Sequence, residues 1–265
     1  MLDSINSAGA LSASQNRLQT ALQALNSGSR INSAADNPAA MAQSASYSVQ
    51  LSAAAQAMNN IQDGISLLGT ASGAFDQIAQ GLQDIRTLAV KAGNASLNTN
   101  DLQAIQGQIG QISQGIDQIA SNTQFNGQNL LTGSLGSLNL QVGPNAGNTQ
   151  SLTLGNLSSA SLGIAAVDVT TTSGQASALS ALDLTIQQLN DQRANVGALQ
   201  AGLTSSLSNL GTASENLAAA KSQISDTNFA QSASDLAQAK VQQQASQHAL
   251  AVYNSTQKNV LSLLK

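Results

Sequence analysis

The chain has 265 residues and a formal net charge of −4, and only 8% of its residues are charged, against roughly 25% in an ordinary soluble domain. It contains no Cys and a single His, which excludes disulfides, thiolate zinc sites and the two-histidine motif of zinc proteases. The 9 basic residues are scattered along the chain, so there is no basic patch to bind phosphates and no nucleic acid partner is expected.

The N-terminal segment lacks the features of a secretory signal. Asp3 stands where a signal peptide would be basic, and no stretch of the chain approaches the roughly 18 apolar residues of a membrane span. The sequence therefore predicts neither export by the general secretory route nor insertion into a membrane.

Apolar residues recur every three or four positions through the first half, which is the spacing of a helix with one buried stripe. One stripe runs from Leu51 to Leu88, and a second runs from Leu102 to Ile119. The pair Asn100-Asp101 can cap the second helix at its N-terminus. Two long amphipathic helices are predicted.

The most regular pattern lies between residues 179 and 224. Steps of seven from Leu182 to Ile224 meet only aliphatic residues. At about 1.5 Å per residue, this helix would be roughly 65 to 70 Å long. Three such helices bury their stripes by packing together, so the sequence predicts a mainly α fold, an elongated antiparallel bundle of long helices or coiled coil.

The only strand-like pattern lies between the long helices. Leu138, Leu140 and Val142 alternate with polar residues, and Gly143–Gly147 has the composition of a turn. This pattern predicts a small β-hairpin at about residues 137–156.

Two other segments of the middle region predict turns or loops. Asn126-Gly127 is a pair that favours a tight hairpin turn. The Thr-rich stretch Val167–Gly174 is polar and predicts a surface loop.

The two ends of the chain carry thinner helical patterns. Isolated helices with so few apolar residues are marginal in water. We therefore expect the two ends to pair with each other, to pair with another chain, or to stay disordered until they do. The leucines of these two patterns are Leu11, Leu18, Leu22, Leu25, Leu236, Leu250, Leu261 and Leu264.

A break separates the N-terminal pattern from the long helices. Asn26–Ser29 can stop a helix, and another can start where Asp36 or Asn37 caps it and Pro38 occupies its first turn. Arg30 and Asp36 flank the break and could pair across it, or could both be solvated.

These breaks predict two domains. Residues 1–37 and 226–265 would form a terminal coiled-coil domain, and residues 38–225 would form a helical rod that includes the hairpin. The predicted inter-domain hinge consists of Arg30, Asp36, Asn37 and Pro38.

No set of residues suggests catalysis. The twelve Asp residues and the single Glu are dispersed, and His248 has no carboxylate nearby in the sequence. We therefore predict a structural protein, not an enzyme, with no catalytic, cofactor or metal site.

Five segments resemble bacterial flagellin, and they occur in the order of that family. The resemblance covers roughly residues 1–170 and 178–265. The segments are SGSRINSAADNPAA (Ser27–Ala40), NIQDGISLLGTASGAFDQI (Asn60–Ile78), LQDIRTLAVKAGN (Leu82–Asn94), TQFNGQNLL (Thr123–Leu131) and VLSLLK (Val260–Lys265).

The resemblance implies a subunit that self-assembles into the hollow helical filament of the bacterial flagellum, which drives swimming. The terminal domain would form the inner tube, and the leucines of its two helical patterns would drive polymerisation. The rod domain would form the outer tube. Most flagellins insert outer variable domains where this chain has only Thr171–Ala178. The resemblance therefore implies a short form without outer domains and a thin, smooth filament.

The resemblance also implies a location and a set of partners. Flagellins leave the cell through the flagellar type III export apparatus, guided by an export chaperone that holds the C-terminal helix. The chain would then be secreted and extracellular, in contact with other copies, the filament cap and the hook-associated junction proteins. The alternative is a hook-filament junction protein of the same secretion system, which would normally lack both LAVKAGN and TQFNGQNLL. An additional adhesion role and O-glycosylation stay open.

A last implication concerns Toll-like receptor 5. In flagellins that activate this receptor, the helix corresponding to Leu82–Asn94 supplies the principal contacts. Gln83 and Leu88 match that motif, whereas Asp84 stands at a position that is basic in those flagellins and Gln108 replaces a Glu. The resemblance therefore implies weak or no activation of the receptor.

Overall fold

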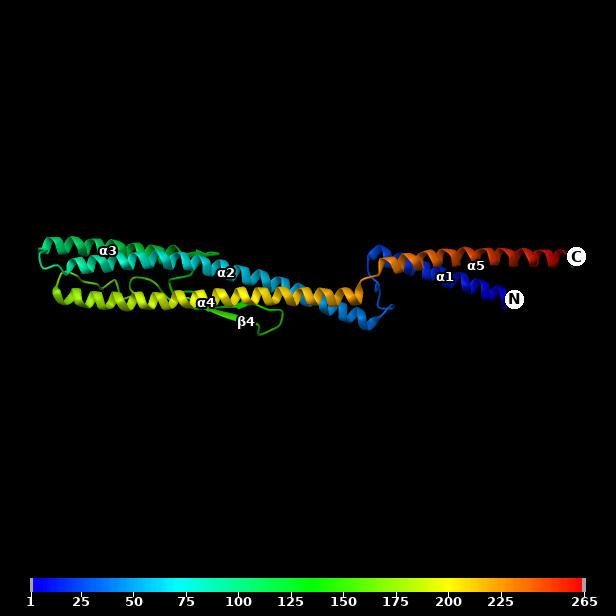
Figure 1. Ribbon diagram of the computed structural model, residues 1–265, viewed down its shortest axis with the longest axis horizontal. Helices are drawn as coiled ribbons and strands as arrows, with labels where there is room; N and C mark the ends of the chain where they lie inside the picture. The colour runs from blue at the N-terminus through cyan, green and yellow to red at the C-terminus, as the bar shows by residue number, and fades with distance from the viewer. Residues whose placement is uncertain (1, 264–265) are drawn as a thin grey trace. The chain divides into compact units, whose positions relative to one another are not determined.

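The computed structural model describes residues 2–263. Over this range the chain forms five helices and two small antiparallel sheets, which confirms the predicted mainly α fold with a hairpin region (Figure 1). The helices are α1 (Leu2–Ser27), α2 (Pro38–Ala92), α3 (Thr99–Asn122), α4 (Thr172–Ser225) and α5 (Phe229–Leu263). The strands are β1 (Gln124–Phe125), β2 (Gln128–Asn129), β3 (Ser137–Gln141) and β4 (Thr149–Thr153).

The chain divides into two compact units. Unit 1 combines Met1–Leu51 with Glu215–Lys265, and unit 2 is Ser52–Ser214, so α2 and α4 contribute to both. In unit 1, α1 lies alongside α5 (Figure 1). This arrangement confirms the predicted pairing of the two ends of the chain.

Unit 2 is a bundle in which the apolar stripes of α2, α3 and α4 share one core. Phe75 and Ile78 of α2 and Ile109 of α3 are almost completely buried. The seven-residue spacing of α4 keeps one side of that helix in the core. The buried positions at this spacing are Leu182, Leu189, Val196, Leu203 and Leu210.

Helix α3 begins earlier than the sequence predicted. The side chain of Asn98 accepts hydrogen bonds from the backbone N–H groups of Asn100 and Asp101, and the Asp101 carboxylate accepts one from the Asn98 N–H at 3.1 Å. The predicted cap is therefore wrong for Asn100, because Asn98 is the N-cap, whereas Asp101 does take part in the cap as the other half of a reciprocal capping box.

The four strands form two hairpins. Asn126 and Gly127, with φ of 50° and 76°, join β1 to β2 in the left-handed conformation that a type I′ turn requires. Strands β3 and β4 pair with Leu138 opposite Leu152. The hairpin predicted at about 137–156 is thereby confirmed.

The segment that enters α4 is partly buried. Val167 is 6% exposed and Val169 is 0% exposed, and α4 already begins at Thr172. The prediction of a polar surface loop over 167–174 is therefore wrong. The reason is that Gln106 of α3 pairs with this backbone as a strand would: its Nε2 donates to Val167 O at 2.8 Å, and Val169 N donates to its Oε1 at 2.9 Å.

Candidate assembly site

Helices α1 and α5 meet along small side chains. Among the side chains that the structure describes on these two helices, the buried ones are Ser14, Ala21, Ala24 and Ala239, at 3 to 9% exposure. An alanine removes much less apolar surface from water than a leucine does. The contact between α1 and α5 therefore stabilises the pair only weakly.

The leucines predicted to drive polymerisation flank this contact and stay partly in water. Leu22 is 39% exposed. Leu264 and the side chain of Leu261 lie outside the described part of the chain. The half-buried leucines are Leu11, Leu18, Leu25, Leu236 and Leu250.

A groove of about 750 Å³ runs between α1 and α5, and we call it the α1–α5 groove. Its floor contains the three buried alanines, which the sequence analysis missed because alanine gives no distinct apolar period. Arg17 of α1 donates from Nη1 to Gln242 Oε1 of α5 at 3.3 Å. The charged residues that line the groove are Arg17, Arg30, Asp226 and Asp235.

Backbone hydrogen bonds connect the end of α1 to the turn between α4 and α5. Arg30 N donates to Ser225 O at 2.7 Å, and Thr227 N donates to Gly28 O at 3.0 Å. Gly28 has φ of 68°, the left-handed conformation that commonly ends a helix. The helix stop predicted at 26–29 is confirmed.

The four residues predicted as a hinge all lie in unit 1, and their role as a hinge stays a prediction. Arg30 donates from Nη2 to Ile224 O at 2.8 Å. The Asp36 carboxylate accepts from the N–H groups of Asn32 and Ser33 at 3.0 and 2.9 Å. The pair of Arg30 with Asp36 is therefore not formed, because each side chain has a backbone partner within reach.

The hydrogen bonds from Asn32 and then Ser33 hold the pKa of Asp36 below its ordinary value. One residue further on, Asn37 caps α2, since its Oδ1 accepts from Ala40 N at 3.0 Å. Pro38 is the first residue of the helix, a position where its missing N–H is not needed. The predicted helix restart is confirmed.

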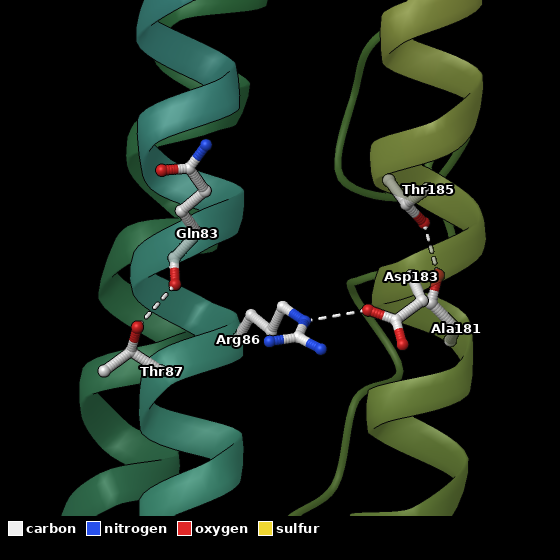
Figure 2. Close-up of polar contacts among 6 residues, drawn as sticks. All are labelled: Gln83, Arg86, Thr87, Ala181, Asp183 and Thr185. Atoms are coloured by element: carbon white, nitrogen blue, oxygen red, sulfur yellow. Dashed lines mark hydrogen bonds and ion pairs between the residues drawn. The ribbon is translucent and has the colours of Figure 1, made fainter.

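The residues that resemble the receptor motif lie on α2 in unit 2. Gln83 and Asp84 are exposed, and Leu88 is half-buried. Figure 2 shows Arg86, on the same helix, reaching across to Asp183 of α4, with 2.8 Å between Nε and Oδ1. The hydrogen bond to Asp183 and the charge of its carboxylate raise the pKa of Arg86. The basic residue nearest to Asp84 in the sequence is thus paired with α4.

A second ion pair joins the same two helices, from Arg193 to Asp76. In this pair the arginine is on α4 and the aspartate is on α2. Both pairs are largely exposed and contribute little to stability. The sequence analysis missed them because their partners lie 97 and 117 positions apart. Gln108, the other receptor-motif position, is exposed on α3.

The remaining polar residues of the described chain show no metal-binding arrangement. Within residues 2–263, no group of three or more His, Cys, Asp or Glu side chains could hold a metal ion. His248 is exposed on α5. None of the described helices has a stretch apolar and long enough to span a membrane.

Both halves of the chain match family models. Residues 3–135 match the bacterial flagellin N-terminal helical region, and residues 179–264 match the bacterial flagellin C-terminal helical region. The flagellin of Halalkalibacterium halodurans is 38% identical over 94% of this chain and 93% of its own length. The flagellin of Bacillus subtilis is 34% identical over 98% and 97%, respectively. The crystal structure of Bacillus cereus flagellin is 30% identical, with a TM-score of 0.52, over 62% of this chain and 94% of that one.

The long-helix bundle, the paired ends and these matches define a structural protein of the bacterial flagellum. The chain belongs to the bacterial flagellin family, and its function is that of a flagellar filament subunit. The resemblance seen in the sequence is confirmed, and the alternative of a hook-filament junction protein is not favoured.

Proposed function

We propose that the chain polymerises into an extracellular helical filament when α1 and α5 associate with the same helices of other copies. The observation that carries this proposal is the thin contact between α1 and α5, in which alanines are buried while the flanking leucines stay partly in water. Burial of those leucines by neighbouring copies couples the ordering of the ends to assembly.

The two parts of the subunit would then have different tasks. Residues 1–37 and 226–265 would form the inner tube of the filament, and residues 38–225 the outer tube. The well-packed core of unit 2 suits a part that is folded before assembly. Between the buried Val169 and the first residue of α4 the chain has only Thr170 and Thr171, which supports a thin filament without outer domains.

The proposed export route and partners rest on the family and on the exposed side chains of α5. Phe229, Val241 and Val252 are 69%, 65% and 63% exposed, and an export chaperone that holds α5 would cover such residues. The proposed partners are this chaperone, the filament cap, the hook-associated junction proteins and other copies. The proposed role is structural, without catalysis, in a filament outside the cell.

Weak or no activation of Toll-like receptor 5 is part of the same proposal. It rests on exposed Asp84, whose negative charge replaces a positive one of the receptor-binding flagellins, and on exposed Gln108. Arg86 does not restore the charge at that position, because it is paired with Asp183.

The test of polymerisation is negative-stain microscopy of purified chain after seeding with filament fragments. The full chain should elongate the seeds, and a chain lacking residues 226–265 should not. A finer variant replaces Leu236 and Leu250 of α5 by Ser, with Leu184→Ser as the control, since Leu184 is 61% exposed on α4 in unit 2. A full chain that stays monomeric with seeds would overturn the proposal.

A further inference from the structure

The turn between β1 and β2 contains a chemically labile pair of residues. Asn126-Gly127 is the only Asn-Gly sequence in the chain. In such a pair the backbone nitrogen of the glycine can attack the side-chain carbonyl carbon of the asparagine, because glycine has no side chain to hinder the approach. Both residues are exposed, so water has access to the site of this reaction.

The reaction is deamidation, and water is its co-reactant. The nitrogen of Gly127 forms a bond to Cγ of Asn126, the bond from Cγ to Nδ2 breaks, and Nδ2 leaves as ammonia with the proton of the Gly127 N–H. Water then opens the cyclic imide. Opening at one carbonyl gives aspartate, and opening at the other gives isoaspartate, in which the main chain runs through Cβ and Cγ.

The conformation of the turn opposes this attack. Asn126 has φ of 50° and is the one residue other than glycine with a positive φ in the described part of the chain. In a type I′ turn the ψ angle at this position is about +30°. At that angle Cβ of Asn126 and the nitrogen of Gly127 lie on opposite sides of the Cα–C bond, whereas ring closure needs them on the same side. The two reacting atoms therefore cannot meet while the turn is formed.

The protection depends on the pairing that holds the turn, since no described atom crowds Gly127. A Cβ built there would meet nothing within 4 Å. On either side of the turn Phe125 pairs with Gln128, and Leu130 N donates to Thr123 O at 3.0 Å. Phe125 packs against the core of unit 2, and Leu130 is completely buried in it. The core thus fixes both strands that close the turn.

We infer that Asn126 is a deamidation site that the β1–β2 turn protects in the folded chain and that becomes reactive when the turn opens. This inference goes beyond the proposed function, because neither the terminal helices nor a second copy takes part. Isoaspartate at position 126 would add one atom to the main chain of the turn, so Phe125 and Gln128 would no longer pair. Aspartate would preserve the turn, because Asp-Gly favours the same geometry.

The first test compares the parent chain in mildly alkaline buffer with and without guanidinium chloride. Mass spectrometry of the peptide that contains Asn126 follows the loss of ammonia and the gain of water. Deamidation should be at least about tenfold slower in the folded chain, because it then requires local opening of the turn. Equal rates in the two conditions would overturn the inference.

The second test weakens the anchor of the turn without changing the reacting pair. Phe125→Ala removes a half-buried ring, and Phe229→Ala is the control, because Phe229 is 69% exposed on α5. Without denaturant, Phe125→Ala should deamidate faster than the parent chain and the control should not. In denaturant all three should react alike. A Phe125→Ala chain that reacts as slowly as the parent chain would contradict the protection by the turn.

Far-UV circular dichroism checks that Phe125→Ala keeps the helix content of the parent chain. If it does not, the comparison on the parent chain still decides whether folding protects Asn126.

The third test concerns the product. Chain deamidated in denaturant is returned to buffer, and the forms with aspartate and isoaspartate at position 126 are separated by chromatography. The isoaspartate form should melt at a lower temperature than the variant Asn126→Asp, which carries the same added charge. The aspartate form should melt like that variant. Identical melting of both forms would show that the turn accommodates isoaspartate and would overturn this part of the inference.

Discussion

Gly64 of α2 lies directly against the side chain of Leu140 of β3. A Cβ at Gly64 would overlap Leu140 Cδ2 and would stand 3.3 Å from Leu203 Cδ1 of α4. Four residues earlier on α2, Asn60 donates from Nδ2 to Gln141 O at 3.2 Å. The hairpin therefore packs onto α2 at a point where the helix has no side chain.

Replacement of Gly64 by Leu should destabilise unit 2 by about 1 to 3 kcal/mol, because the added side chain competes with Leu140 for the same space. Gly69→Leu is the matched control, since a Cβ there meets nothing within 4 Å. The control should stabilise the chain by up to about 1 kcal/mol, because leucine has a higher helix propensity than glycine. Thermal unfolding followed by circular dichroism measures both, and equal effects of the two variants would contradict the steric account.

Gln106 should contribute to stability through its two hydrogen bonds to the backbone around Val167 and Val169. Gln106→Ala leaves a partly buried carbonyl and a partly buried N–H without partners, which should cost about 2 to 3 kcal/mol. Gln103→Ala, an exposed position of the same helix, should cost little. Chemical denaturation of both variants gives the difference. A loss of the same size in both would mean that the pairing of Gln106 is not stabilising.

Protonation of Asp36 should release the loop that its carboxylate holds. The pKa of Asp36 is lower in the folded chain because the N–H groups of Asn32 and Ser33 donate to its carboxylate. A lowered pKa means that the contribution to stability is present above the ordinary Asp pKa of 3.8 and is lost as the pH falls through the folded value. Resonances of the Asn32 and Ser33 amides should therefore titrate below pH 3.8.

Asp36→Asn is the control for this titration, because an amide does not ionise in this range. The same two amide resonances should then show no transition between pH 5 and the acid limit of the folded chain. A transition that persists in the variant would assign the titration to another group.

The receptor proposal predicts that reversing the charge at position 84 increases signalling. Monomer of the parent chain should give a weak response in cells that report Toll-like receptor 5, and the double variant D84R/Q108E should give a stronger one. Asp63→Arg, an exposed aspartate elsewhere on α2, is the control and should leave the response weak. A strong response to the parent chain would contradict the proposal.

The features that the sequence predicted are those set by residues close together in the chain, such as repeating apolar positions and turn pairs. Leu182, Leu189 and Val196 are seven residues apart and face the core, since a helix returns to nearly the same side after two turns. Asn126-Gly127 forms the turn that its conformational preferences favour. Such features depend on neighbours in the chain, and neighbours are visible in the sequence.

The features that the sequence did not predict depend on residues far apart. Nothing around Gln106 indicates that its amide will meet Val167, 61 positions later, and Thr-rich composition alone suggested that this segment was exposed. The floor of the α1–α5 groove was missed for another reason. Ala21, Ala24 and Ala239 occur in a chain rich in alanine, so their burial becomes visible only when α1 and α5 lie together.

The hydrogen bonds of Gln106 to the backbone should be insensitive to the salt concentration around the subunit. Thr185 holds the chain a few residues before this segment through a hydrogen bond from Oγ1 to Leu162 O at 2.7 Å, and Gln175 donates from Nε2 to Val169 O at 3.0 Å. All of these groups are uncharged. Dissolved salt weakens attraction between exposed ions but leaves hydrogen bonds between neutral groups almost untouched. These contacts should therefore be the same in dilute and in saline water.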